Sequence, residues 1–176
     1  MCESSKKCFL SSLRDKKKSK EDTVLSLLHQ TKVLKNKSGD GPVPVLDLDS
    51  HLKGKVLGLL FSAHWCPPCR EFTPILKKFY EQVSDAEFEI IFFSKDHSKD
   101  EYTDYLKDDH GDWCTVPFED SLIEKLKDRY DVKSIPTLII VKHSGEVVVK
   151  NAWAAVQNAS KPPKELLAQW KKLCDL

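Results

Sequence analysis

The sequence of 176 residues has no long apolar run. Its longest, VLGLLFSA at residues 56–63, is far shorter than the roughly 20 apolar residues that cross a bilayer as a helix. Near the start the only apolar patch is CFLSSL at 8–13, shorter than the roughly 7–15 residue core of a secretory signal. We therefore expect neither a membrane span nor secretion. The predicted compartment is the cytoplasm, with the nucleus as a second one.

The sequence also has little net charge, since 28 Lys and Arg face 27 Asp and Glu. The charge is unevenly spread, because residues 1–37 hold ten basic and four acidic residues. The basic run LRDKKKSK at 13–20 is compatible with a tether to nucleic acid or an anionic membrane, with a nuclear-import patch, or with a solvated arm. We expect a basic, disordered arm at 1–21 and one domain at 22–176. The acidic body makes direct nucleic-acid binding the least favoured of these roles.

Internal repeats and low-complexity segments are absent, and the six cysteines do not cluster. Only Cys66 and Cys69 have a chemically meaningful spacing. Without a secretory signal, this pattern predicts free thiols and one reactive pair. Cys114, next to a tryptophan, is predicted to be a small buried hydrophobe. No role is assigned to the cysteines near the two ends, which are Cys2, Cys8 and Cys174.

Hydrophobic periodicity predicts alternating strands and helices. Two runs, at 54–63 and 88–94, are apolar at nearly every position, which is typical of strands covered on both faces. A short helix within 22–30 and a hairpin at 31–48 come first, and Pro42 and Pro44 favour a sheet edge for its second strand. The other expected elements are helices at 67–83, 99–109, 121–130 and 162–174 and a hairpin at 135–150. This order predicts an α/β fold, a three-layer sandwich with a central mixed sheet and helices on both faces.

The cysteine pair lies where the buried strand at 54–63 passes into the helix at 67–83. A helix N-terminus favours negative charge, so Cys66 is the expected nucleophile. Cys69 follows one turn later, where it can attack Cys66 and release a bound thiol. Pro67 suits the first helical position because the amide there has no partner in any case.

Two other roles for such a pair are a metal site and a structural link. A zinc knuckle needs a second ligand pair, for which only His64, Cys114 and His143 are candidates. A structural disulfide one helical turn long would constrain almost nothing. Both are less favoured than a redox centre, and we expect no metal and no organic cofactor.

The segments FSAHWCPPCREFTPILKKFYEQ, VPFED and YDVKSIPTLIIV resemble the tryparedoxin/nucleoredoxin-like branch of the thioredoxin superfamily. The resemblance implies a thioredoxin-like fold, with Cys66 as the exposed nucleophile and Cys69 as the resolving thiol. It also implies that Pro136 is a cis-proline and that the Ile135 backbone pairs with an incoming peptide. Trp65 would then be an apolar platform for the substrate, with Pro67 also in the substrate-binding set.

The chain departs from related patterns at two positions, and the role of a third residue is open. Thioredoxin itself has a buried carboxylate six residues before the nucleophile, where this chain has Leu60. Lys95 stands where tryparedoxins have tryptophan, which is closer to the nucleoredoxin pattern. His64 either assists proton transfer or is merely solvated.

The resemblance implies reduction of protein disulfides through a Cys66/Cys69 cycle that regulates other proteins, signalling or transcription proteins among them. An external reductase or thiol would supply the electrons. The alternative is a redox-sensitive protein-binding module with little turnover.

Overall fold

The computed structural model describes residues 23–37, 40–83, 87–159 and 161–176. The arm expected at 1–21 lies outside these residues, as do Cys2 and Cys8, and the domain boundary at residue 22 stays a prediction. Among the helices of the described part of the chain, none combines the length and the apolar content that crossing a membrane requires.

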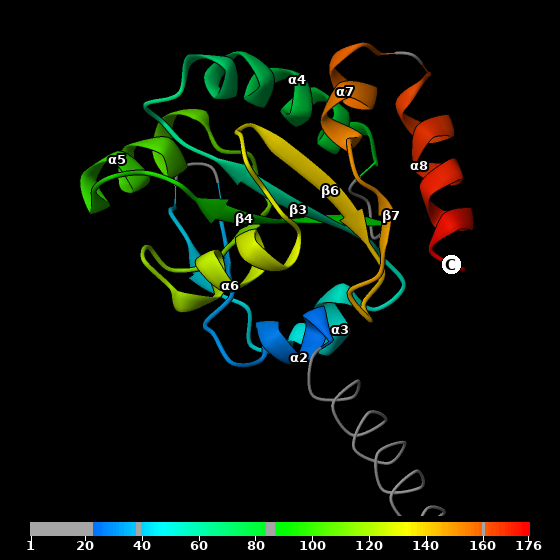
Figure 1. The fold of residues 1–176 in the computed structure, drawn as a ribbon, viewed down its shortest axis with the longest axis horizontal. Helices are drawn as coiled ribbons and strands as arrows, with labels where there is room; N and C mark the ends of the chain where they lie inside the picture. Colours follow the sequence, from blue (N-terminus) through cyan, green and yellow to red (C-terminus); the bar gives the residue numbers. More distant parts are fainter. Residues whose placement is uncertain (1–22, 38–39, 84–86, 160) are drawn as a thin grey trace, which may run out of the picture.

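In the described residues seven strands form one mixed sheet, in the order β2-β1-β5-β4-β3-β6-β7 (Figure 1). β4 pairs in parallel with both β3 and β5, whereas β3–β6, β6–β7, β1–β2 and β1–β5 are antiparallel. The strands are β1 (Leu34–Lys35), β2 (Val43–Pro44), β3 (Val56–Ser62), β4 (Phe88–Ser94), β5 (Cys114–Thr115), β6 (Thr137–Val141) and β7 (Val147–Val149). The predicted hairpin before β3 is confirmed, and Pro44 lies on an edge strand as expected.

β3 and β4 lie near the centre of the sheet, and every residue in them is buried. Successive side chains of a strand point to opposite faces. Accordingly Val56 and Leu60 join one apolar cluster, while Leu57 and Phe61 join the other. A strand with two apolar faces needs cover on both sides, and this need produces the three layers.

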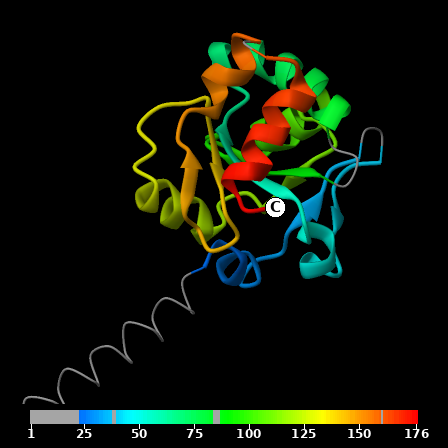
Figure 2. The same ribbon diagram turned by 90° about the vertical axis from the view of Figure 1, so that its right-hand side faces the viewer.

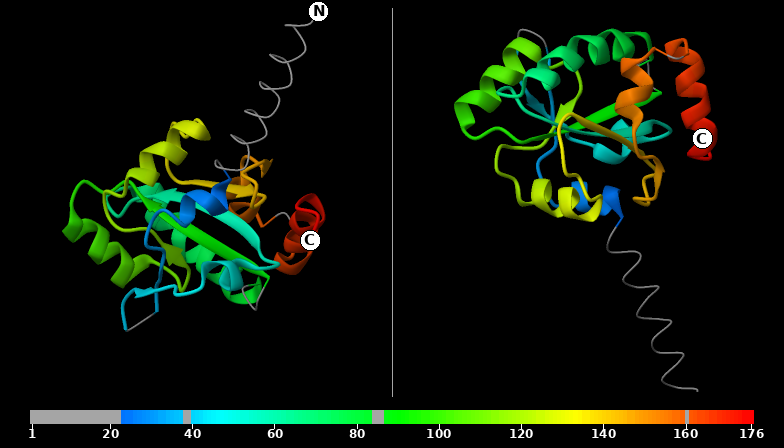
Figure 3. Two further views of the ribbon diagram at one scale, coloured as in Figure 1. Left: turned by 90° about the horizontal axis from the view of Figure 1, so that it is seen from below. Right: turned by 45° about the horizontal axis from the view of Figure 1, so that its top comes forward.

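Helices cover both faces of the sheet (Figures 2 and 3), which confirms the predicted sandwich. One cluster contains side chains of α4 (Pro67–Val83), α5 (Lys99–Asp104), α7 (Ala152–Gln157) and α8 (Pro163–Leu173). The other contains side chains of α2 (Val24–Leu28), α3 (Leu48–Leu52) and α6 (Ser121–Arg129). α4 buries Phe72, Leu76 and Phe79 at helical spacing, and each such side chain stabilises the fold by roughly 1.5–3 kcal/mol relative to an exposed one.

Three short elements differ from the expectations. The helix expected over 99–109 is α5 followed by a π-helical turn, η1 (Tyr105–Asp109). The expected second strand of the first hairpin ends early, because Asp47 caps α3 by accepting from the Ser50 amide. α7 has no counterpart among the expected elements, and it begins after Asn151, whose side chain accepts from the Ala154 amide.

Candidate active site

The cysteine pair sits at the junction of β3 and α4, as predicted. α4 begins at Pro67, and the Cys66 carbonyl accepts a hydrogen bond from the Arg70 amide at 3.1 Å. Cys66 is therefore the residue that directly precedes the first helical position. Prolines in the first turn lack only amide protons that would have no partner within the helix.

The two sulfurs lie 2.6 Å apart, so a disulfide bond of about 2.05 Å can form with little movement. Cys69 is 0% exposed and Cys66 is 4% exposed. Cys66 thus faces solvent more than Cys69, although it is less exposed than the resemblance implies. Burial, followed by the hydrogen bond with Cys66, raises the pKa of the Cys69 thiol to about 12. Cys69 is consequently a protonated thiol at neutral pH.

The Ile135–Pro136 peptide bond is cis, as the resemblance implies. The Cys66 thiol points to the Ile135 carbonyl, with 3.9 Å between sulfur and oxygen. Ile135 also packs against the small apolar cluster of Ala63, Cys66 and Cys69. The structure therefore brings the four predicted residues Cys66, Cys69, Ile135 and Pro136 together.

Trp65 borders a groove of about 600 Å³ beside Ile135. Its side chain is 43% exposed, its indole N–H donates to the Lys95 carbonyl at 2.9 Å, and its ring stacks on His97. A second groove of about 640 Å³ lies beside Pro136 and is bordered by Pro68 and Trp153 among others. Of the two prolines between the cysteines, Pro68 borders this second groove. Pro67, predicted to bind substrate, is exposed and is not among the described residues that line either groove.

A chain of three hydroxyl groups begins at Ser62, next to the Cys69 thiol. Leu60 is buried in the apolar cluster, and Ser62, two residues later on the same face, is hydrogen-bonded to the Tyr105 hydroxyl at 3.0 Å. The Tyr105 hydroxyl also lies 2.6 Å from that of Thr73, which donates to the Cys69 carbonyl. A hydrogen bond from Ser62 partly offsets the rise in the Cys69 pKa that burial causes. The hydroxyl of Ser62, and not a carboxylate, is therefore the polar side chain that bonds to the Cys69 thiol.

Sequence reasoning missed this hydroxyl network. Burial raises the pKa of the Tyr105 phenol, so this group is protonated at neutral pH. A serine at the end of an otherwise apolar buried strand was the available signal, because buried hydroxyls need hydrogen-bond partners.

His64 is paired rather than freely solvated. Its Nδ1 lies 3.1 Å from an Asp109 oxygen, and its backbone amide donates to Asp96 at 2.6 Å. Burial raises the pKa of Asp96, although hydrogen bonds from Ser94 and from the His64 amide oppose this rise. Lys95 forms an ion pair with Glu124 of α6. The carboxyl groups of Asp96 and Asp109 thus lie next to His64, in the loop that precedes the cysteines.

The zinc knuckle considered for Cys66 and Cys69 is not assembled in the described residues. Cys114 lies next to His51 instead, and His143 contacts the Lys55 carbonyl. Cys114 is fully buried, as predicted. Its neighbours are nevertheless polar, because His51 and Glu89 both lie close to its sulfur.

Comparisons with known proteins place the chain in a family. The thioredoxin-like family model matches residues 54–147. Nucleoredoxin of Bos taurus is 39% identical over 112 residues, which make up 62% of this chain and 25% of that protein. The chain therefore spans about a quarter of the length of the nucleoredoxins it matches.

Solved structures place the chain in the same family. Thioredoxin from Wuchereria bancrofti is 48% identical with a TM-score of 0.66, and the match covers 80% of this chain and 93% of that one. Tryparedoxin I from Leishmania major is 35% identical with a TM-score of 0.65, over 78% of this chain and 90% of that one. The chain belongs to the thioredoxin-like family, in the tryparedoxin/nucleoredoxin-like branch of the thioredoxin superfamily.

Proposed function

We propose that the protein is a thiol–disulfide oxidoreductase that reduces protein disulfides with Cys66 and Cys69. Membership of its family supports redox activity in general. The observation that carries the finer proposal is the contact of two sulfurs 2.6 Å apart at a helix start, beside a cis X-Pro bond. In our proposal Cys66 is the nucleophile, Cys69 the resolving thiol and Ile135 the backbone that binds the peptide, and the proximity of these three residues supports these roles.

The reaction begins when the Cys66 thiolate attacks one sulfur of the substrate disulfide. The substrate S–S bond breaks, a mixed disulfide forms on Cys66, and the departing sulfur takes up a proton. Cys69 then loses its proton and attacks the Cys66 sulfur, so that the second substrate thiol leaves. The substrate gains two electrons and two protons, and the enzyme is left with a Cys66–Cys69 disulfide. An external reductase or thiol returns two electrons to the pair.

The second step depends on removing the proton of a buried thiol. The Ser62 hydroxyl bonds to Cys69 and stabilises its thiolate as the proton leaves, and the hydroxyls of Tyr105 and Thr73 hold Ser62 in place through their hydrogen bonds. Hydrogen bonds to the charged form of a group favour that form. In this proposal Ser62, supported by Tyr105 and Thr73, performs part of the task of the carboxylate that Leu60 replaces.

The substrate is an extended peptide segment around a disulfide. In our proposal its backbone pairs with Ile135 as a short strand, a recurrent mode of peptide recognition. Trp65 and the two flanking grooves then contact the residues on either side. We propose that the protein acts in the cytoplasm and nucleus, where it regulates signalling or transcription proteins by reducing their disulfides.

The test is reduction of insulin disulfides with dithiothreitol as the electron donor. We expect turnover by the unaltered protein, a rate at the uncatalysed level for Cys66→Ser, and accumulation of a mixed disulfide for Cys69→Ser. Cys174→Ser is the matched control and retains turnover. If the unaltered protein were no faster than Cys66→Ser, the proposal would be wrong, and the binding-module alternative would replace it.

A further inference from the structure

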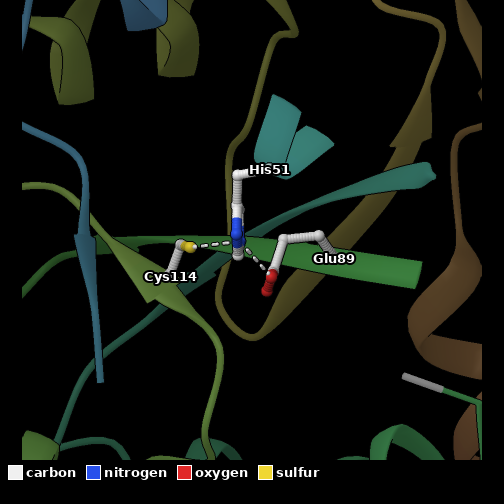
Figure 4. A group of neighbouring side chains, drawn as sticks. All are labelled: His51, Glu89 and Cys114. Carbon is white, nitrogen blue, oxygen red and sulfur yellow. Dashed lines mark hydrogen bonds and ion pairs between the residues drawn. The ribbon is translucent and has the colours of Figure 1, made fainter. Parts of the chain in front are cut away.

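A second polar cluster lies at the other end of the sheet from the cysteine pair. His51 of α3, Glu89 of β4 and Cys114 of β5 hold one potential ligand atom each within 4.8 Å of the others, with the His51 imidazole between the sulfur and the carboxylate (Figure 4). Glu89 is the second residue of β4, whereas the cysteine pair follows the carboxyl end of the parallel strand β3. The cluster is therefore separate from the proposed active site.

The distances within the cluster lie near those of a tetrahedral metal ion, and one of them has to widen. The imidazole Nε2 of His51 lies 2.7 Å from Glu89 Oε2 and 3.5 Å from Cys114 Sγ, and all three ligand atoms lie within 4.8 Å of one another. Zinc bonds to sulfur are about 2.3 Å and those to nitrogen or oxygen about 2.0–2.1 Å, so tetrahedral ligands stand about 3.6 Å (S to N) and about 3.3 Å (N to O) apart. The sulfur–nitrogen distance already matches. The nitrogen–oxygen distance has to widen by about 0.6 Å.

The donor types also suit zinc. A thiolate, an imidazole and a carboxylate are the three side-chain ligands that zinc uses. Their three source elements belong to the folded core, which limits how far the ligands can drift apart. The His51 side chain is 23% exposed, so water has access for a fourth coordination position.

We propose that His51, Glu89 and Cys114 bind a zinc ion, with water as the fourth ligand, and that this ion fastens α3 to the sheet. The carboxylate is already oriented by other groups. Glu89 Oε1 accepts hydrogen bonds from the Tyr80 hydroxyl and the Ile90 amide, both at 3.1 Å. Such supporting contacts hold ligands in place in metal sites.

Zinc binding would require the Cys114 thiol to lose its proton. Burial, together with the charge of Glu89, raises the pKa of the Cys114 thiol well above its ordinary value. Burial alone would raise the pKa of Glu89, but hydrogen bonds from His51 and Lys35 and their charges lower it overall, so the carboxylate is ionised. Zinc would displace the Cys114 proton, and its affinity therefore rises with pH.

Two lysines compete with the metal for the carboxylate. Lys35 lies 2.7 Å and Lys55 4.0 Å from Glu89 Oε2. They balance the buried charge in the metal-free protein and repel a divalent cation. Lys35 also contacts the Tyr80 hydroxyl at 2.8 Å, so it can keep one partner while Glu89 turns to the metal. Removing its charge is expected to strengthen metal binding.

The test is titration of a Cys66→Ser/Cys69→Ser protein with Co²⁺ and then Zn²⁺, so that the active pair contributes no thiolate. We expect one tetrahedral cobalt with a thiolate charge-transfer band, which zinc displaces. On this background Cys114→Ser loses the band, His51→Ala weakens binding at least about tenfold, and Lys35→Gln tightens it. Cys174→Ser, which alters another buried thiol, is the control and leaves the band unchanged.

Circular dichroism of each variant establishes that it is folded. His51→Ala alters a half-buried residue and keeps the test decisive if Cys114→Ser does not fold. The proposal is overturned if the background protein gives no charge-transfer band, or if the band survives His51→Ala at unchanged affinity. These readouts do not involve disulfide reduction, so the zinc site and the proposed function stand or fall separately.

Discussion

In a Cys66→Ser protein, Cys69 should react with iodoacetamide far more slowly than an exposed thiol. The pKa of Cys69 is raised from the ordinary 9.0 to about 12. At pH 8 a thiol with the ordinary value is about one-tenth thiolate, whereas one with a pKa of about 12 is about one ten-thousandth thiolate. The thiolate fraction alone therefore slows alkylation roughly 1,000-fold. Burial is the largest cause of this shift, so most of it should persist when the Cys66 sulfur is removed.

The assay is mass spectrometry of the peptide that contains Cys69, after alkylation from pH 7 to pH 10.5. The expected rate rises tenfold per pH unit over this range without levelling off. Cys66 in a Cys69→Ser protein is the matched control, and it should be alkylated much faster at pH 8. A rate for Cys69 that levels off near pH 9, or that lies within tenfold of the Cys66 rate, would refute the division of roles between the two sulfurs.

Three further predictions concern residues around the two clusters. Tyr105→Phe leaves Ser62 with one hydrogen bond fewer, so the protein should lose about 1–2 kcal/mol of stability. Stopped-flow fluorescence should also detect slower release of the mixed disulfide, and an unchanged release rate would exclude a role for this hydroxyl. Trp65→Ala should raise KM for insulin several-fold and lower Tm only slightly, because Trp65 is 43% exposed and packs mainly on His97; an unchanged KM would argue against a substrate platform. Glu89→Gln should cost about 1–3 kcal/mol in urea unfolding at pH 7. Since folding lowers the Glu89 pKa, its ionised form stabilises the protein above about pH 4.5, and the gap between variant and unaltered protein should shrink as the pH falls below that value. A gap that does not change with pH would mean that the buried carboxylate is not ionised.

The fold was predictable where one strong signal decided each element. β3 and β4 are buried throughout, and α4 follows β3 with buried positions at helical spacing. Sequence reasoning failed for α3 and α7, which contain five and six residues. Their starts depend on single capping side chains, Asp47 and Asn151. α2 is equally short but buries three apolar residues, whereas α3 and α7 bury only two each, which is too few for apolar periodicity to reveal a helix.

The candidate site was predictable only in part. The cysteine spacing and the resemblance identified Cys66, Cys69, Ile135 and Pro136, which the structure brings together. The contacts of Tyr105 with Ser62 and Thr73 join three separate elements. The cluster around Glu89 likewise joins residues from distant parts of the sequence. Such groupings come from tertiary structure, and no local pattern announces them.

The central claim is that Cys66 attacks and Cys69 resolves, and trapping a reaction intermediate tests it most directly. A Cys69→Ser protein is mixed with a peptide disulfide, quenched with acid and mapped by mass spectrometry, with a Cys66→Ser protein as the control. The account predicts a stable peptide adduct on Cys66 in the first protein, no adduct on Cys69 in the control, and only the Cys66–Cys69 disulfide in the unaltered protein. An adduct that forms on Cys69 as readily as on Cys66, or one that persists in the unaltered protein, would contradict it.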